Sequence, residues 1–281
     1  MAVMHSETEW LACDGTPMHA VRWLPDVEPI MVVCIIHGLG EHSGRYEHLA
    51  QYFASFGIEV VSFDLRGHGK SEGQRGHTSD LQQMVLDIDR FLNQASKIDL
   101  AKPHFIYGHS LGATLAIKYT LSNPGDYNGV ILSAPMLKPA FEPPKWKVFL
   151  GAKLQQLWPS LSLCSEVDIK TLSRDAAVLA KHKDDPLNHD RISAKLGTQL
   201  LEAGEQLLAD ASLVDFPLLM MHGDADELTC HKASTIFSEC AGDLCTLKIW
   251  EDFYHELHHE PEKEDVYDYC IDWMNRQLKP A

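Results

Sequence analysis

Six apolar, strand-like runs alternate with helical segments along most of this 281-residue chain. Such runs, rich in Val, Ile, Leu and Met, are typical of strands that are buried on both faces of a sheet. In chain order they are IMVVCIIHG, IEVVSFD, PHFIYG, GVILSAP, FPLLMMHG and LCTLKIW. The alternation predicts an α/β fold, with a mostly parallel central sheet and helices on both faces.

The strand-helix rhythm breaks between residues 136 and 212. Four prolines at 135, 139, 143 and 144 lead into a helix-like apolar stretch that no strand follows until Phe216. We therefore predict a core formed by residues 1–135 and 213–281, with residues 136–212 inserted as a cap over the carboxyl edge of the sheet. Two local features are also predicted. Asp14-Gly15 marks an opening hairpin, and Ser79 with Gln82 marks a helix-capping box.

The composition of the chain indicates which partners it can bind and in which cellular compartment it works. A formal charge of −16 argues against nucleic acid, because phosphate binding needs a basic face. Seven cysteines without a Cys-x-x-Cys pair indicate reduced, mostly buried thiols and not a disulfide framework. No signal peptide and no stretch of membrane-spanning length is visible in the sequence. The expectation is a soluble, cytoplasmic protein without a metal or other cofactor.

A Gly-x-Ser-x-Gly motif, GHSLG at residues 108–112, follows one predicted strand directly and runs into a helix. This context places Ser110 on a tight turn that exposes its hydroxyl, with glycines where side chains would collide. A serine hydroxyl is a poor nucleophile until a base removes its proton and an acid orients that base. The motif therefore predicts an acid and a histidine further along the chain.

Both partners have candidates in loops that follow later strands. His255 lies in the loop after TLKIW, where the expected order of serine, acid and histidine requires the base. The residues alone leave Asp224, Asp226 and Glu227 in competition for the acid. A rival pattern, His-Glu-x-x-His at 255–259, would bind zinc only if its histidines stood one turn apart on a helix. The segment is too short for that before Pro261, so we do not predict a metal site.

The early HGLG segment at residues 37–40 suits an oxyanion hole. A tetrahedral intermediate needs two preorganised backbone N–H donors, and glycines let the backbone approach the substrate. The residue after the nucleophile supplies one donor, which is Leu111. The loop after the early strand supplies the other, which is Leu39.

Long motifs in this order resemble the monoacylglycerol lipases of the α/β-hydrolase superfamily. They are HGLGEHSGRY, FDLRGHGKSEGQRGH, GHSLGA, LSRD, DPL, HGDAD and YHELHHE. The resemblance spans nearly the whole chain and implies a triad of Ser110, Asp226 and His255, which favours Asp226 over the other acids. It also implies Leu39 and Leu111 as oxyanion donors. The family's mammalian members carry a reactive cysteine where this chain has Thr229, with Cys230 next to it.

The implied reaction is hydrolysis of monoacylglycerols to fatty acid and glycerol through an acyl-enzyme. A carboxylesterase or lysophospholipase of broader specificity is the alternative. A ligand-binding receptor without turnover and an aminopeptidase are further hypotheses from other classes. A dehalogenase would need Asp at position 110 and is excluded.

Three polar residues near the oxyanion loop predict a glycerol head-group site. Glu41 and Arg45 follow Leu39 closely, and His258 follows His255 by three residues, so all three can face one crevice. The alternative for Glu41 and Arg45 is a surface pair at a helix start. The cap suggests a second partner. Its first part combines apolar residues with four lysines, which suits transient docking on anionic lipid, or else a solvated face over an apolar tunnel.

Overall fold

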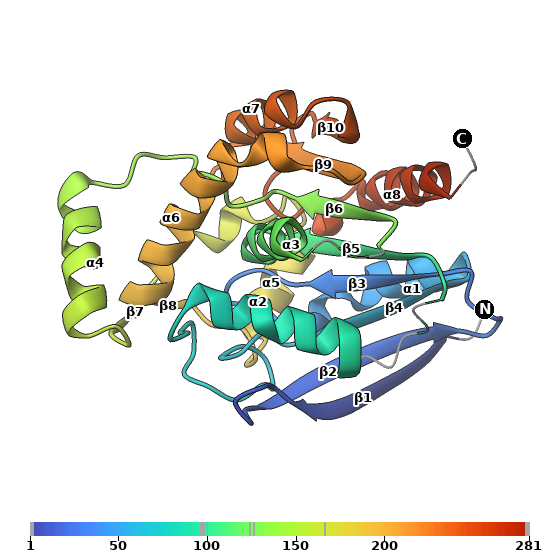
Figure 1. The fold of residues 1–281 in the computed structure, drawn as a ribbon, viewed down its shortest axis with the longest axis horizontal. Coiled ribbons are helices and arrows are strands. Elements are labelled where there is room, and N and C mark those ends of the chain that lie inside the picture. Colours follow the sequence, from blue (N-terminus) through green and yellow to red (C-terminus); the bar gives the residue numbers. More distant parts are fainter. Residues whose placement is uncertain are drawn as a thin grey trace.

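The computed structural model describes residues 3–95, 99, 101–123, 125, 127–165 and 167–278, without the side chains of residues 94, 95 and 147. An eight-stranded sheet runs through its centre in the order β1-β2-β4-β3-β5-β6-β9-β10 (Figure 1). Its strands are β1 (Val3–Leu11), β2 (Pro17–Pro25), β3 (Met31–Ile36), β4 (Ile58–Phe63), β5 (His104–His109), β6 (Gly129–Ser133), β9 (Leu218–Gly223) and β10 (Cys245–Trp250).

The strands from β4 to β10 are parallel, and β2 pairs antiparallel with β4 at one side. All six apolar runs that predicted strands form strands, and the mostly parallel α/β sheet is confirmed. The opening hairpin is also present as β1 and β2, with Gly15 at a φ of 83° in the turn. Because parallel strands end at one edge, the loops after β3, β5, β9 and β10 meet there.

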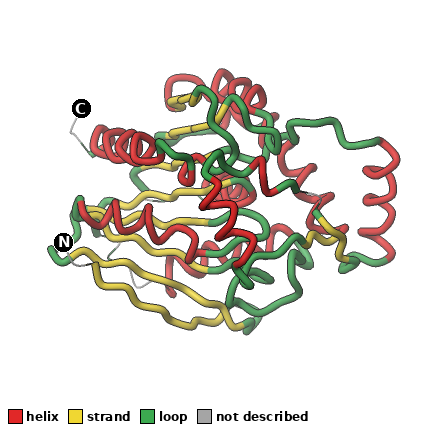
Figure 2. The backbone as a smooth tube through the Cα atoms, turned by 180° about the vertical axis from the view of Figure 1, so that it is seen from behind, coloured by secondary structure: helices red, strands yellow, loops and turns green. Residues whose placement is uncertain are grey.

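Helices cover both faces of the sheet (Figures 1 and 2). One face packs against α2, α3, α6 and α7, and the opposite face packs against α1 and α8. Their bounds are α1 (Glu47–Ser55), α2 (Leu81–Arg90), α3 (Leu111–Ser122), α6 (Ala194–Ala209), α7 (His231–Ala241) and α8 (Lys263–Gln277). Short 3-10 turns lie at η1 (Ser43–Tyr46), η3 (Ile169–Thr171), η4 (Ala211–Leu213), η5 (Gly242–Leu244) and η6 (Leu257–His259), and η2 (Phe91–Ala95) is a π-helix.

Residues 136–212 connect β6 to β9 and lie beyond the carboxyl ends of the strands. They form α4 (Lys145–Leu157), β7 (Ser162–Cys164), α5 (Ala176–Asp184), β8 (Arg191–Ser193) and α6. Helix α4 stands on the outer side of α6, away from the sheet (Figure 1). The division into a core and a cap at residues 136 and 212 stays a prediction.

Two local predictions are wrong. The α2 N-cap is Asp80 and not Ser79, because the Asp80 carboxylate accepts the N–H of Gln82 at 2.8 Å. The cysteines are all free, but only Cys34 and Cys270 are buried, whereas three others are exposed. The exposed cysteines lie in a turn (Cys13), in the short strand β7 (Cys164) and on α7 (Cys240), and spacing along the chain does not reveal which of these positions face solvent. None of the described helices has the length and apolar character that crossing a bilayer requires.

Candidate active site

Ser110 occupies a strained turn between β5 and α3. Its backbone has φ 53° and ψ −116°, which places it in a region that costs a residue with a side chain roughly 1–3 kcal/mol. The flanking glycines are required by space. A Cβ at Gly108 would lie 2.6 Å from the Cα of Ala113, and a Cβ at Gly112 would lie 2.1 Å from the carbonyl oxygen of Ile36. The crowding packs the start of α3 against the end of β3.

The loops after β9 and β10 bring one acid and one histidine together. His255 Nδ1 lies 2.8 Å from Asp226 Oδ2, and both side chains are buried. Asp226 Oδ1 accepts the backbone N–H groups of Leu228 at 2.7 Å and Thr229 at 3.0 Å. Asp224 is exposed and instead accepts the N–H of Asp252. The geometry therefore pairs His255 with Asp226 and not with its neighbour.

His255 lies beside the Ser110 turn. Its ring centroid is 4.8 Å from that of His109, the residue before Ser110. Burial alone would lower the pKa of His255, but the charge and hydrogen bond of Asp226 outweigh it and raise the pKa above its ordinary value. Burial, together with His255, lowers the pKa of His109 to about 4. His109 is thus neutral at pH 7, whereas the pKa of His255 is shifted in the opposite direction.

The loop after β3 lies against the serine. A Cβ at Gly38 would be 3.2 Å from the Cβ of Ser110, so the loop backbone borders this serine directly. His37 anchors this loop, because its Nε2 accepts the backbone N–H of Leu65 at 2.8 Å. Leu111 is the first residue of α3, and such a residue has no partner for its N–H within its own helix. Both expected oxyanion donors, Leu39 and Leu111, therefore belong to segments that flank Ser110.

Glu41 and Arg45 form a buried cluster beneath the oxyanion loop. Glu41 is 3% exposed, and its Oε1 accepts the N–H of Gly38 at 2.5 Å and the hydroxyl of Tyr46 at 2.8 Å. Arg45 Nη1 donates to Glu41 Oε2 at 2.8 Å and to Glu256 Oε1 at 2.6 Å. Burial would raise the pKa of Glu41, but the Arg45 charge lowers it to about 2. The alternative of a surface pair is wrong, because both side chains are buried.

His258 lies next to this cluster and differs from its neighbours. It is 0% exposed, and neither of its ring nitrogens has a hydrogen-bond partner among the described residues. The ring stacks on Tyr46 with centroids 4.6 Å apart and meets His109 edge-on at 4.8 Å. Burial holds the pKa of His258 well below its ordinary range, so the ring is neutral, with one donor and one acceptor.

Two residues near these groups had no role in the sequence-based prediction. Glu256 binds Arg45 and His259, and His222 contacts Asp226. Their only sequence signal was a place inside the HGDAD and YHELHHE motifs. The histidines of the rival zinc pattern serve separate partners. His255 contacts Asp226, while His259 Nδ1 lies 2.7 Å from Glu256.

The cap segment contacts the loops that surround Ser110. His42 Nε2 lies 2.9 Å from Asp185 Oδ2, and the N–H of His189 donates to the carbonyl oxygen of Gly40 at 2.9 Å. On the other side, the N–H of Glu256 donates to the carbonyl oxygen of Leu172 at 2.8 Å. The inserted segment is therefore hydrogen-bonded both to the oxyanion loop and to the loop that carries His255.

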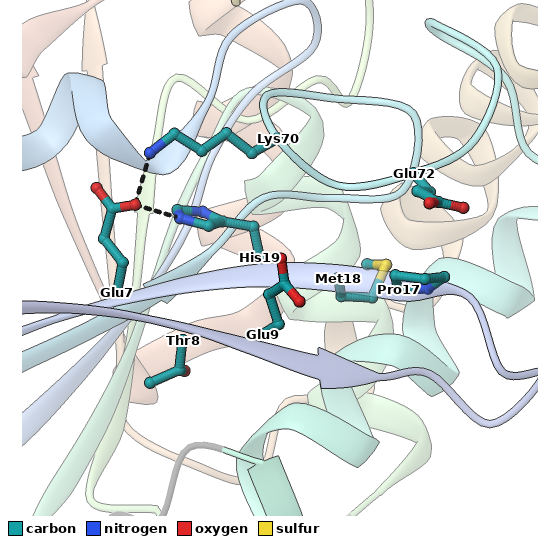
Figure 3. A pocket seen from close by; sticks show the side chains of 8 residues that line it. All are labelled: Glu7, Thr8, Glu9, Pro17, Met18, His19, Lys70 and Glu72. Atoms are coloured by element: carbon teal, nitrogen blue, oxygen red, sulfur yellow. Dashed lines mark hydrogen bonds and ion pairs between the residues drawn. The ribbon is translucent and has the colours of Figure 1, made fainter.

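A surface pocket of about 360 Å³ lies away from these residues, at the β1-β2 hairpin (Figure 3). Within it, Glu7 Oε2 accepts from Lys70 Nζ at 2.6 Å and lies 2.9 Å from His19 Nε2. The pocket residues are Glu7, Thr8, Glu9, Pro17, Met18, His19, Lys70 and Glu72. Because its central carboxylate is already paired and Ser110 is elsewhere, this pocket is not the candidate active site.

A mostly parallel eight-stranded sheet, with a serine on the turn between β5 and α3, defines this protein as an enzyme of the α/β-hydrolase fold. Residues 27–262 match the family model of serine aminopeptidase S33, and the chain belongs to this family as a monoacylglycerol lipase-like ester hydrolase. The family assignment confirms the resemblance to monoacylglycerol lipases.

Several relatives match over most of their length. A monoacylglycerol lipase of Mycolicibacterium smegmatis is 33% identical over 275 residues, covering 97% of this chain and 98% of that protein. The human monoglyceride lipase is 33% identical over 273 residues, covering 95% of this chain and 90% of that protein. An abhydrolase domain-containing protein of Dictyostelium discoideum is 40% identical over 98% of this chain, but the chain spans only 30% of its length.

Solved structures agree with the fold. The crystal structure of Paleococcus ferrophilus monoacylglycerol lipase has a TM-score of 0.83 and 31% identity, covering 99% of this chain and 100% of that one. A monoglyceride lipase variant from Saccharomyces cerevisiae, solved with a substrate analog, has a TM-score of 0.87 and covers 100% of this chain and 97% of that one. At 21% identity, the latter supports the fold alone.

Proposed function

We propose that this protein hydrolyses monoacylglycerols to fatty acid and glycerol through an acyl-enzyme on Ser110. The observation that carries the proposal is the 2.8 Å contact between His255 Nδ1 and Asp226 Oδ2, next to the strained Ser110 turn. With Nδ1 donating to Asp226, the other ring nitrogen, Nε2, is the one that carries no proton in the neutral ring. His255 can then act as the general base for Ser110.

The reaction follows from these assignments. His255 Nε2 takes the Ser110 proton as Oγ attacks the ester carbonyl, and the N–H groups of Leu39 and Leu111 stabilise the oxyanion. His255 then returns the proton to the departing glycerol oxygen, which leaves an acyl-enzyme. Water, activated by the same imidazole, attacks the acyl-enzyme and releases the fatty acid.

The glycerol head group is proposed to bind beside the oxyanion loop, at Glu41, Arg45 and His258. Within this trio, Glu41 already accepts hydrogen bonds from Gly38 and Arg45, and Arg45 also donates to Glu256. His258 is buried, and neither of its ring nitrogens has a partner in the part of the chain that the structure describes. We therefore assign direct contact with a glycerol hydroxyl to His258, and support of the surrounding wall to Glu41 and Arg45.

The cap is proposed as the surface that meets lipid. Helix α4 and its flanks expose large apolar side chains, including Phe149, Leu157 and Trp158, of which Leu157 is 83% exposed. Lys145 and Lys153 lie on the same helix. Apolar and basic residues together favour an interface that is rich in anionic lipid, where a monoacylglycerol partitions. The seven free cysteines suit a reducing compartment, and we propose the cytoplasm.

The family name raises peptide hydrolysis as an alternative reaction. An aminopeptidase needs an unpaired carboxylate to bind the substrate amino group, but Glu41 and Glu256 are both paired with Arg45. This pairing favours the ester over a peptide with a free amino terminus. A broader carboxylesterase or lysophospholipase differs only in the leaving group.

A fluorophosphonate labelling experiment tests the mechanism. The probe should modify Ser110 alone, as located by peptide mass spectrometry, and should block release of fatty acid from a monoacylglycerol. A panel of monoacylglycerols, lysophospholipids and p-nitrophenyl esters then ranks leaving groups by kcat/KM. Label on another residue, or turnover that persists after complete labelling, would refute the proposed nucleophile.

A further inference from the structure

A second histidine contacts the carboxylate that we propose as the triad acid. His222 belongs to β9, is fully buried, and places its Nε2 3.0 Å from Asp226 Oδ2. The same oxygen lies 2.8 Å from His255 Nδ1. One carboxylate oxygen therefore lies between two imidazole rings, and only one of these rings borders Ser110.

The hydrogen-bond pattern fixes the tautomer of His222. An ionised carboxylate can only accept, so His222 Nε2 must donate to Asp226. Its other nitrogen, Nδ1, lies 2.8 Å from the hydroxyl of Ser234, a buried residue of α7. In a neutral ring this nitrogen accepts, so Ser234 donates. Hydrogen bonds at both ring nitrogens therefore hold the His222 ring in one orientation.

Asp226 receives more donors than a simple triad needs. Besides the two histidines, the hydroxyl of Thr229 donates to Oδ2 at 2.7 Å, and two backbone N–H groups donate to Oδ1. These contacts hold the carboxylate in place. Each further donor on Oδ2 also withdraws negative charge from the hydrogen bond with His255, because the same lone pairs are shared.

We propose that His222 is a positioning residue that orients Asp226 and limits how strongly this carboxylate increases the basicity of His255. The inference rests on the proposed function, because it assumes that His255 is the base. His255 is also faced by His109 from β5 and lies near Glu256 and Glu41. A substitution at position 222 changes none of these groups. Its effect passes through Asp226 and through Thr229, whose Oγ1 lies 3.1 Å from His222 Nε2, donates to Asp226 Oδ2 and lies 3.3 Å from His255 Nδ1.

The rate at which a fluorophosphonate labels Ser110, measured from about pH 5 to about pH 9, tests this role. In His222→Leu we expect the midpoint of the rising acid limb to move upward by roughly half a unit or more. The limiting labelling rate should fall by about 10-fold, because Asp226 is less well oriented. His222→Gln, which keeps a side-chain N–H, should return the midpoint towards that of the unmodified protein.

His231 offers a matched control. The centroid of its ring lies 6.4 Å from that of His222. His231→Gln should leave the midpoint and the rate unchanged. An unmoved midpoint in a folded His222→Leu protein overturns the inference while leaving the triad intact. Failure of Ser110 to react in the unmodified protein would instead overturn the proposed function.

Ser234→Ala keeps the inference testable if His222→Leu does not fold. Loss of the Ser234 hydroxyl frees His222 Nδ1 and allows the ring to leave the tautomer that donates to Asp226. The midpoint should then move in the same upward direction, by a smaller amount. An unchanged midpoint in Ser234→Ala, with His222→Leu unfolded, would contradict the proposal.

Discussion

Arg45 donates two parallel hydrogen bonds to Glu256, the residue directly after His255, at 2.6 and 2.7 Å. The same guanidinium binds Glu41 at 2.8 Å, and Glu41 in turn holds the N–H of Gly38. Arg45 thus ties the oxyanion loop to the loop of the candidate base. Two carboxylates and one guanidinium are buried together, which is tolerable only while they remain paired.

Removal of Arg45 should therefore be costly to stability. Arg45→Met leaves Glu41 and Glu256 buried without their cation, and we expect a loss of about 3–5 kcal/mol in the free energy of unfolding. Urea denaturation at neutral pH measures it. The triple variant Glu41→Gln, Arg45→Met and Glu256→Gln removes all three charges of this cluster and should recover much of the loss. If Arg45→Met lowers the free energy of unfolding by less than about 1 kcal/mol, the ion pairs of Arg45 contribute no more than surface pairs do.

Ser110→Ala should lower turnover of a monoacylglycerol by a factor on the order of 10⁶, because the members of a triad act as one unit. The protein should remain folded, because the change from serine to alanine removes only a hydroxyl group from the strained turn. Fatty-acid release and circular dichroism of the same sample report both properties. Retention of more than a few per cent of the activity would remove Ser110 from the mechanism.

The pH profile should show a base with a raised pKa. Asp226 raises the pKa of His255 above its ordinary value of 6.5, and only the neutral ring can accept the serine proton. kcat/KM should therefore increase with pH through a midpoint above 6.5. In Asp226→Asn the carboxylate charge is lost, so the midpoint should move down and the rate should fall by about 10⁴. Asp224→Asn, at an exposed carboxylate, is the control, and an equal effect there would contradict the assignment.

Substitutions of His258 and Glu41 should differ in how they affect substrates with and without a glycerol group. His258→Phe keeps an aromatic ring on Tyr46 but removes both free nitrogens, so kcat/KM for a monoacylglycerol should fall by about 10-fold to 100-fold. A p-nitrophenyl ester of the same acid, which lacks glycerol, should be spared. Glu41→Ala should slow both substrates, because the N–H of Gly38 loses its partner. If His258→Phe lowers kcat/KM equally for both substrates, His258 does not contact the glycerol group.

Membrane docking through the cap predicts charge-dependent flotation. The protein should float with liposomes that contain anionic lipid more than with neutral ones, because the lysines of α4 are attracted to the surface. Lys145→Glu combined with Lys153→Glu should reduce flotation while leaving hydrolysis of a water-soluble ester unchanged. Flotation that ignores both lipid charge and these substitutions would leave α4 as a solvated face.

The strand framework was predictable because the central strands are short runs dominated by apolar residues. In β3, β4, β6 and β9 every residue is buried, so the composition of each run reports its environment directly. The tight turn at Ser110 was equally readable, since glycine is the only residue that the neighbouring backbone admits at positions 108 and 112. The choice of Asp226 over Asp224 as the triad acid came from the family resemblance and stays a prediction, although Asp226 is the one in contact with His255.

Other features depend on contacts between distant segments. Glu256 meets Arg45 across 211 positions of the chain, and no periodicity links them. The capping residue of α2 was misassigned because Ser79 and Asp80 are both good caps and only backbone geometry chooses between them. The sequence also could not predict whether Glu41 and Arg45 are buried or exposed, because polar residues near an active site occur in both environments.

The length of chain that connects β6 to β9 also affects how the protein assembles. These strands are neighbours in the sheet, with Val130 opposite Leu218 and Ser133 opposite Met221. During synthesis, β6 is complete long before its partner leaves the ribosome, so its open edge remains a template for mispairing. The proposed nucleophile is made early, whereas Asp226 and His255 follow only after the last two strands. Under the proposed mechanism, a nascent chain therefore carries Ser110 without its base, and hydrolysis cannot begin before the final strands have joined the sheet.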